Sequence, residues 1–195
     1  SSPFTGGAIL GDRVRMQEHA GDPNVFIRSV ATRGVLGGIS HSTRDLIAMF
    51  DSLGFERIIV ETVGVGQSEL AIMEIADSVV VLVTPESGDS IQAMKAGLFE
   101  VADVFLINKA DRPGADAMSR DLTEAVSLGT PGERKIPVLK GSGIRQEGVD
   151  ELIQTVHRHL EWCGGDGKDF WARRRGQARE RFFLDLVMSQ RRQHV

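Results

Sequence analysis

The sequence predicts an α/β fold: a mostly parallel β-sheet flanked by helices, followed by a helical arm at the C-terminus. Short runs rich in β-branched residues alternate with longer segments of helical character. Three of these runs lack polar alternation, which is typical of parallel strands that are buried on both faces. The chain ends in a long basic segment whose apolar residues recur at helical spacing.

The expected strands and helices alternate along the middle of the chain. The predicted strands are 57–61, 78–84, 104–108 and a weaker one at 136–139. The predicted helices are 42–53, 68–76, 90–101, 115–128 and 147–160. Strands and helices in this order form right-handed crossovers, and ligands of such sheets bind beyond the carboxyl ends of the strands.

The C-terminal segment differs in charge from the rest of the chain. A glycine-rich linker is predicted at 161–167, and one long helix is predicted at 168–193. From Lys168 onward there are eight Lys and Arg residues against three Asp and Glu residues, although the whole chain carries a formal net charge of −4. One face of this helix carries the apolar residues Trp171, Ala178, Phe182 and Leu186. A basic tail on an acidic body indicates an arm with a function of its own.

Composition excludes several classes of protein. The hydrophobic share of 41% and the charged share of 26% are those of a globular protein, so extensive disorder is excluded. A pI of about 5.7 argues against a nucleic-acid-binding protein held mainly by phosphate contacts. No apolar run reaches the ~20 residues that span a bilayer, and no signal peptide is visible. The single cysteine, Cys163, favours a reducing compartment, so we expect a cytoplasmic protein without nucleic-acid or membrane partners.

The most informative motif is Asn108-Lys109-Ala110-Asp111, directly after a predicted buried strand. An aspartate carboxylate can accept hydrogen bonds from both N1–H and N2–H₂ of guanine, and adenine does not offer that pair of donors. The stem of Lys109 can lie along the base plane, and Asn108 can tie neighbouring loops together. The motif predicts guanine recognition, with an ordinary polar loop as the alternative.

Two further motifs contribute carboxylates. Glu61 follows a predicted strand and precedes Gly64 by three residues, the spacing of the Asp-x-x-Gly motif of GTPases. Its carboxylate can hold Mg²⁺ through water or position the attacking water, and the Gly64 N–H can sense the γ-phosphate. Asp12 lies beyond a run of glycines and can serve as a second Mg²⁺ ligand. The alternatives are a glycine-rich turn for Glu61 and a helix cap for Asp12.

Two weaker segments follow other predicted strands. Backbone N–H groups of Ser142, Gly143 and Ile144 can meet guanine O6. The segment from Gly88 to Lys95 is either a mobile switch or a capped helix start. The phosphate-binding pattern G-x-x-x-x-G-K-[ST] does not occur in the chain.

These motifs, in this order, resemble those of the MeaB/ArgK-type GTPases, the metallochaperones of methylmalonyl-CoA mutase. The resemblance is carried by SSPFTGGAILGDRVRM, ATRGVLGGIS, ETVGVGQSE, GDSIQAMKAG, NKAD and the basic C-terminal arm. It covers nearly the whole chain and implies a P-loop GTPase fold. In that family the first strand and the phosphate loop precede the segment that matches Ser1, so we expect a fragment that is inactive alone.

The resemblance implies a protein that binds and hydrolyses GTP and gates the loading and protection of adenosylcobalamin in methylmalonyl-CoA mutase, with GTP/GDP and Mg²⁺ as cofactors. It implies a G domain at 1–160, incomplete at its N-terminus, and a linker with a dimerisation arm at 161–195. The implied partners are the mutase, the adenosyltransferase as a second candidate, and another copy of the chain in a homodimer. By motif matching, the implied residues are Asp12 and Glu61 for catalysis and Mg²⁺; Asn108, Lys109, Asp111, Ser142, Gly143, Ile144 and Gly64 for the nucleotide; and Gln67, Gly88, Asp89, Gln92 and Lys95 for the switch.

Two other hypotheses remain open. A chaperone GTPase for another metal, such as nickel, is disfavoured because such metals prefer Cys and His ligands, which are scarce here. A GTPase-derived docking module without turnover is favoured by the missing phosphate loop if the chain is complete. Nucleotide binding with Mg²⁺ distinguishes the mutase-associated GTPase from the docking module. Metal titration distinguishes it from a chaperone for another metal.

Overall fold

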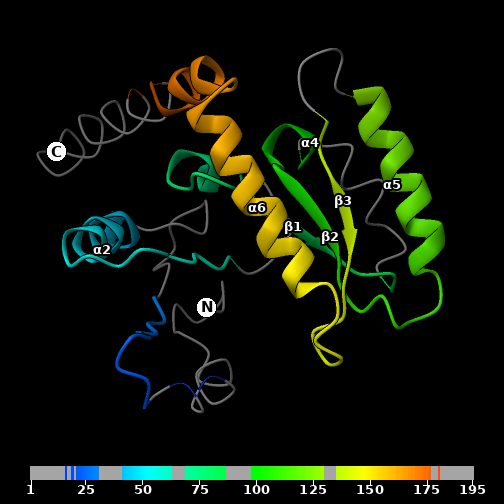
Figure 1. Ribbon diagram of the computed structural model, residues 1–195, viewed down its shortest axis with the longest axis horizontal. Helices are drawn as coiled ribbons and strands as arrows, with labels where there is room; N and C mark the ends of the chain where they lie inside the picture. The colour runs from blue at the N-terminus through cyan, green and yellow to red at the C-terminus, as the bar shows by residue number, and fades with distance from the viewer. Residues whose placement is uncertain are drawn as a thin grey trace, which may run out of the picture. The chain divides into compact units, whose positions relative to one another are not determined.

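The computed structural model describes residues 16, 19, 21–30, 41–62, 69–86, 98–129, 135–176 and 180 (Figure 1). The chain divides into two compact units, Ser1–Ala71 and Ile72–Val195. The second unit contains the sheet, and the division falls within a short 3₁₀ helix, η2 (Glu69–Glu74). Among the described residues, no helix is both long enough and apolar enough to cross a membrane.

The first unit contains α2 (His41–Ser52), which matches the helix predicted at 42–53. The ring of Phe50 packs against the rings of both Phe26 and Phe55, with a centroid distance of 5.2 Å in each pair. Such inclined aromatic pairs combine apolar burial with a favourable ring geometry. Gly54, at φ 82°, turns the chain after the helix, as glycine does at many helix ends.

The strand predicted at 57–61 is wrong for this structure. Residues 55–62 have no strand assignment, and no backbone hydrogen bond joins 57–61 to another described residue. Ile59 is 94% exposed rather than buried. A β-branched run favours an extended backbone, but a strand also needs a neighbour that pairs with its N–H and C=O groups. The described part of the chain supplies no such neighbour here.

The second unit confirms the predicted parallel sheet. Its strands are β1 (Val80–Val83), β2 (Val104–Ile107) and β3 (Val138–Lys140), in the order β1-β2-β3. Both pairings are parallel, with Val81 opposite Phe105 and Phe105 opposite Val138. These strands correspond to the runs predicted at 78–84, 104–108 and 136–139. Burial is deepest in β2, where Val104, Phe105 and Ile107 are fully buried, whereas Leu82 of β1 remains 62% exposed.

Helices lie on both sides of this sheet (Figure 1). They are α5 (Ala115–Gly129) and α6 (Val149–Gly164), close to the helices predicted at 115–128 and 147–160. The apolar residues of α5 pack on the sheet and complete the main core, which is made of Val83, Ala102, Phe105, Ile107, Ala115, Met118, Leu122, Val126 and Ile136. Met118, Leu122 and Val126 are spaced four residues apart, which places them on one face of a helix with 3.6 residues per turn.

Three other predicted segments differ in extent. The helix predicted at 68–76 is the 3₁₀ helix η2, and of the helix predicted at 90–101 the described part is α4 (Leu98–Val101). α6 continues to Gly164, past the predicted start of the linker, because Cys163 is buried four residues after His159. Residues 168–176 are helical, as predicted, and most of the remainder of the predicted helix to 193 lies outside the described residues.

Gly148 fixes the start of α6 beside β3. It has φ 78°, a conformation that residues with a side chain rarely adopt. A Cβ atom at this position would lie 2.3 Å from the carbonyl oxygen of Lys140 and 2.9 Å from Cα of Gly141. Both neighbouring atoms belong to the backbone and cannot turn away, so the close approach requires glycine.

We therefore expect Gly148→Ala to destabilise the protein by about 1–3 kcal/mol, since the backbone must shift and the positive φ is strained. Urea unfolding followed by circular dichroism measures the change. Gly164→Ala is the matched control, because Gly164 has open space around it and lies in the last turn of α6. Equal stabilities of the two variants would contradict this account of Gly148.

Candidate functional site

The carboxyl ends of the three strands bring separate loops together. Asn108 N–H donates to the carbonyl of Val83 at 2.8 Å, and Gly141 N–H donates to the carbonyl of Ile107 at 2.9 Å. Ala110 N–H reaches the Gly141 carbonyl at 2.9 Å. The loops that follow β1, β2 and β3 thus meet at one edge of the sheet, where ligands of parallel sheets bind.

Asn108 joins two of these loops through one side-chain oxygen. Its Oδ1 accepts hydrogen bonds from the N–H of Lys109 at 2.8 Å and from the N–H of Gly143 at 3.3 Å. Lys109 has φ 56°, which is costly for a residue with a side chain, and the bond to Asn108 helps to hold it there. This conformation fixes the direction in which the Lys109 side chain leaves the loop.

Asp111 faces the loop after β3. Its Oδ1 accepts a hydrogen bond of 2.6 Å from the hydroxyl of Ser142, which is almost completely buried. This bond, more than any other contact, lowers the pKa of Asp111 below its usual value, while partial desolvation opposes the shift. Among the described residues, no Lys, Arg or His nitrogen pairs with the Asp111 carboxylate. The exposed carboxylate therefore stays ionised and keeps acceptor capacity for a ligand.

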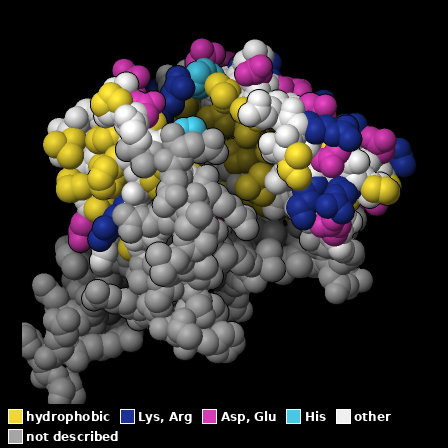
Figure 2. All heavy atoms as spheres, turned by 90° about the horizontal axis from the view of Figure 1, so that it is seen from below, with side chains coloured by type: hydrophobic (Ala, Val, Ile, Leu, Met, Phe, Trp, Pro, Cys, Tyr) yellow, Lys and Arg dark blue, Asp and Glu magenta, His cyan; other side chains and the backbone are white. Residues whose placement is uncertain are grey.

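Glu86, in the turn after β1, was missed by the sequence analysis. One of its oxygens pairs with Lys109 Nζ at 2.8 Å, and the other pairs with Arg112 Nη1 at 3.0 Å. The hydrogen bond and charge of Lys109, followed by the charge of Arg112, lower the pKa of Glu86. Figure 2 shows basic and acidic side chains next to one another on the face that it presents. The signal that could have found Glu86 is its position, directly after a strand that ends at the same edge as Asn108.

The structure brings together five of the predicted nucleotide residues, Asn108, Lys109, Asp111, Ser142 and Gly143. Ile144 lies in the same loop with its side chain 88% exposed. Glu61 is exposed in the first unit, at the end of the run 57–61 that has no strand assignment. The remaining predicted site residues lie outside the described residues; they are Asp12, Gly64, Gln67, Gly88, Asp89, Gln92 and Lys95. Within the described ranges, no group of three or more His, Cys, Asp or Glu residues could hold a metal ion.

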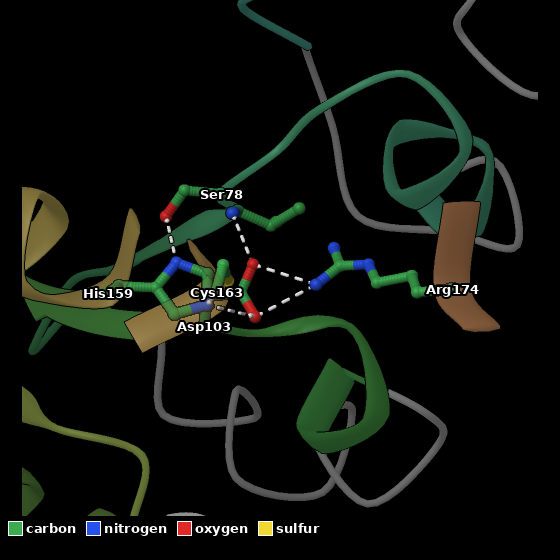
Figure 3. Close-up of polar contacts among 6 residues, drawn as sticks. Ser78, Asp103, His159, Cys163 and Arg174 are labelled. Carbon is green, nitrogen blue, oxygen red and sulfur yellow. Dashed lines mark hydrogen bonds and ion pairs between the residues drawn. The ribbon is translucent and has the colours of Figure 1, made fainter. Parts of the chain in front are cut away.

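A second polar cluster lies at the opposite, amino ends of the strands (Figure 3). Asp103, which directly precedes β2, is 1% exposed. Its Oδ2 accepts the N–H of Val79 at 2.7 Å, and its two oxygens accept Arg174 Nη1 at 2.9 and 3.0 Å. Arg174 belongs to the helical residues 168–176, so this carboxylate joins the start of the C-terminal segment to the sheet.

His159 of α6 completes this cluster. Its Nδ1 lies 3.0 Å from Ser78 Oγ, and its Nε2 lies 3.3 Å from Cys163 Sγ (Figure 3). A nucleophile, a histidine and an acid within reach of one another suggest a catalytic triad. However, the thiol and the Asp103 carboxylate, at 3.6 Å, face the same nitrogen, whereas a triad needs them on opposite nitrogens. Ser78 is on the other nitrogen, but the oxygens of Asp103 are already engaged by Val79 N–H and Arg174. Cys163 and His159 are also buried, so we interpret the cluster as structural.

Comparison with known proteins agrees with this arrangement. A model of the family described as methylmalonyl Co-A mutase-associated GTPase MeaB matches residues 1–195. A putative GTPase of Pyrococcus horikoshii is 49% identical over 86% of this chain and 54% of its own length. A mouse protein, the mitochondrial methylmalonic aciduria type A homolog, is 37% identical over 80% of this chain and 39% of its own length. The chain thus spans about half the length or less of these relatives.

A solved structure has the same fold. The crystal structure of an LAO/AO transport system kinase aligns with a TM-score of 0.66 and 25% identity, covering 78% of this chain and 49% of its own. A TM-score of this size over most of the chain confirms the predicted α/β architecture, in which a parallel sheet is flanked by helices.

For the cluster at the amino ends, we expect Asp103→Asn to lower the free energy of unfolding by about 3–5 kcal/mol, because it leaves the buried Arg174 guanidinium without its counter-charge. Urea unfolding measures the loss, and limited trypsin digestion at 173–175 reports release of the C-terminal helix. Asp77→Asn is the control, since Asp77 pairs with Arg175 at the exposed surface and should change stability by less than about 1 kcal/mol. Similar losses in both variants would refute the special role of Asp103.

Proposed function

The chain belongs to the MeaB family of methylmalonyl-CoA mutase-associated GTPases, and on that premise we propose that the protein binds GTP and hydrolyses it to GDP and phosphate. The observation that carries the proposal is the meeting of Asn108, Lys109 and Asp111 with Ser142 at the carboxyl edge of the sheet. Because this chain spans about half of the relatives' length, the proposal concerns the whole protein.

The guanine base is read, in this proposal, by the Asp111 carboxylate. Ser142 holds one carboxylate oxygen and leaves lone pairs for N1–H and N2–H₂ of the base. Asn108 fixes the loop after β3 by accepting the Gly143 N–H, and the Ser142 N–H donates to the Glu147 carbonyl. The backbone N–H of Ile144 in the same loop is therefore the proposed donor to guanine O6. The apolar stem of Lys109 supplies a surface for the flat base. An adenine ring would leave the carboxylate without a matching donor pair, which disfavours ATP.

Hydrolysis is assigned to carboxylates outside the guanine loops. Glu61 is exposed, and its oxygens are of the hard type that Mg²⁺ prefers, so the donor chemistry fits the ion. Mg²⁺ would supply charge stabilisation for the phosphates when bound. Glu61 would position it, or the attacking water, and Asp12 is the second proposed ligand. The Gly64 N–H and the switch residues between Gln67 and Lys95 would respond to the γ-phosphate.

We further propose that the partner is methylmalonyl-CoA mutase or a related adenosylcobalamin mutase, whose cofactor loading and protection the GTPase cycle gates. The family is described as mutase-associated, and the name of the mouse relative refers to methylmalonic aciduria, which supports this choice. The adenosyltransferase is a second candidate partner. The helix that begins at Lys168 is the proposed dimerisation arm, anchored through Arg174. The buried thiol of Cys163, in α6, suits a reducing compartment, and we propose the cytoplasm.

Replacing the guanine reader should change base preference. In the full-length protein, Asp111→Asn is expected to weaken GTP binding by about 100-fold, since an amide cannot accept both N–H groups. Xanthosine triphosphate, which offers a carbonyl at position 2, should bind the variant better than GTP does. Isothermal titration calorimetry measures both affinities, with Asp116→Asn as the control at an exposed carboxylate nearby. Unchanged GTP affinity would remove Asp111 from this role.

Replacing the proposed catalytic carboxylate should slow turnover without abolishing nucleotide binding. In the full-length protein with the mutase present, Glu61→Gln is expected to lower the GTPase rate at least about tenfold, because the amide positions the metal or water poorly. Phosphate release measures the rate, and GDP affinity should stay close to that of the wild type. Glu56→Gln, at an exposed carboxylate of the same unit, is the control. A wild-type GTPase rate for Glu61→Gln would show that another group positions the metal ion or the water.

A further inference from the structure

Glu86 stands at the point where two parts of the proposed nucleotide site meet. It lies in the turn that follows β1, and its side chain reaches the loop that follows β2. In sequence it is the last described residue before the segment that contains Gly88 and Lys95. No motif singled it out, and the proposed hydrolysis does not use it.

Both oxygens of Glu86 are occupied by cations of the guanine loop. Lys109 Nζ lies 2.8 Å from one oxygen, and Arg112 Nη1 lies 3.0 Å from the other. The loop between these cations is closed by a backbone hydrogen bond of 2.9 Å from Arg112 N–H to the Lys109 carbonyl. One carboxylate therefore holds the side chains at both ends of a tight turn that includes Asp111.

We propose that Glu86 is a positioning residue for guanine recognition: it holds the ammonium group of Lys109 and draws the cations of Lys109 and Arg112 away from Asp111. This inference rests on the proposed GTPase function and names a residue that the motif does not contain. Its physical basis has two parts, the conformational freedom of Lys109 and the competition between two neighbouring carboxylates.

The first part concerns the Lys109 side chain. A lysine side chain has large rotamer entropy, which is lost when its stem is fixed against a flat base. The backbone of Lys109 is already set by its positive φ and by Asn108, and Glu86 fixes the far end of the side chain. A side chain held at both ends loses less entropy when the base binds, so nucleotide affinity rises.

The second part concerns Asp111. Arg112 is its direct neighbour in sequence and Lys109 is two residues away, so both could reach its carboxylate. Such a pair would occupy the lone pairs that guanine N1–H and N2–H₂ need. In the structure both cations pair with Glu86, and the Asp111 carboxylate accepts a hydrogen bond from the neutral hydroxyl of Ser142. Glu86 thus leaves the lone pairs of the Asp111 carboxylate accessible to the base.

The test compares two exposed carboxylates in the full-length protein. Because an exposed pair contributes modestly, Glu86→Gln is expected to raise the Kd for GDP about threefold to fivefold. The factor should be the same for GTP, since the base is common to both nucleotides. Asp116→Asn is the matched control, because Asp116 pairs with Lys140 at 2.7 Å and touches neither guanine-loop cation. Calorimetry measures the affinities, and Glu86→Asp, which keeps the charge, should recover part of the loss.

A double-mutant cycle separates positioning from a general structural effect. Lys109→Met keeps most of the apolar stem and removes the ammonium group. When Glu86→Gln is added to Lys109→Met, it should raise the Kd for GDP only by the part that depends on Arg112. An equal additional rise on that background would overturn the inference, as would a Kd for Glu86→Gln equal to that of Asp116→Asn. If the wild-type protein failed to bind GDP, the proposed function itself would fall. If the wild type bound GDP and the Glu86→Gln variant had the same Kd, only the proposed role of Glu86 would be refuted.

Discussion

The described polar sites of the second unit depend on one buried strand, β2. Val104, Phe105 and Ile107 are completely inaccessible, and β1 and β3 pair with β2 on either side. Because such a strand cannot shift without breaking two sets of hydrogen bonds, the residues at its two ends are held firmly. Asp103 precedes it and Asn108 follows it, so the buried anchor and the guanine loop are placed by the same four residues.

The two ends of β2 use polar groups in opposite ways. At the amino end, Asp103 is buried, and its oxygens are saturated by Val79 N–H and Arg174. A carboxylate in that state stabilises structure and has no capacity left for a ligand. At the carboxyl end, Asp111 is exposed and keeps lone pairs beyond the bond from Ser142. Asp103 and Asp111 are the same type of residue, so their roles differ because of burial and of how many hydrogen bonds each carboxylate already accepts.

Sequence periodicity was sufficient to predict the parallel sheet, because buried strands and the apolar face of α5 each leave a distinct pattern. It also placed the loops of Asp111 and Ser142 beyond the carboxyl ends of strands, and in the structure these two side chains are hydrogen-bonded. It could not predict Asp103 with Arg174, which lie 71 residues apart and pair only through the fold. Glu86 was missed for the same reason, because its role depends on the direction of the Lys109 side chain.

The segment 57–61 shows the limit of such reasoning most clearly. Its β-branched residues favour an extended backbone, but the structure assigns them no strand and no ladder to another described residue. Extended conformation is a local property, whereas a strand is a property of two neighbouring segments. In β2 both requirements are met, and three of its four residues are buried. The difference between these two apolar runs therefore lies in their neighbours among the described residues.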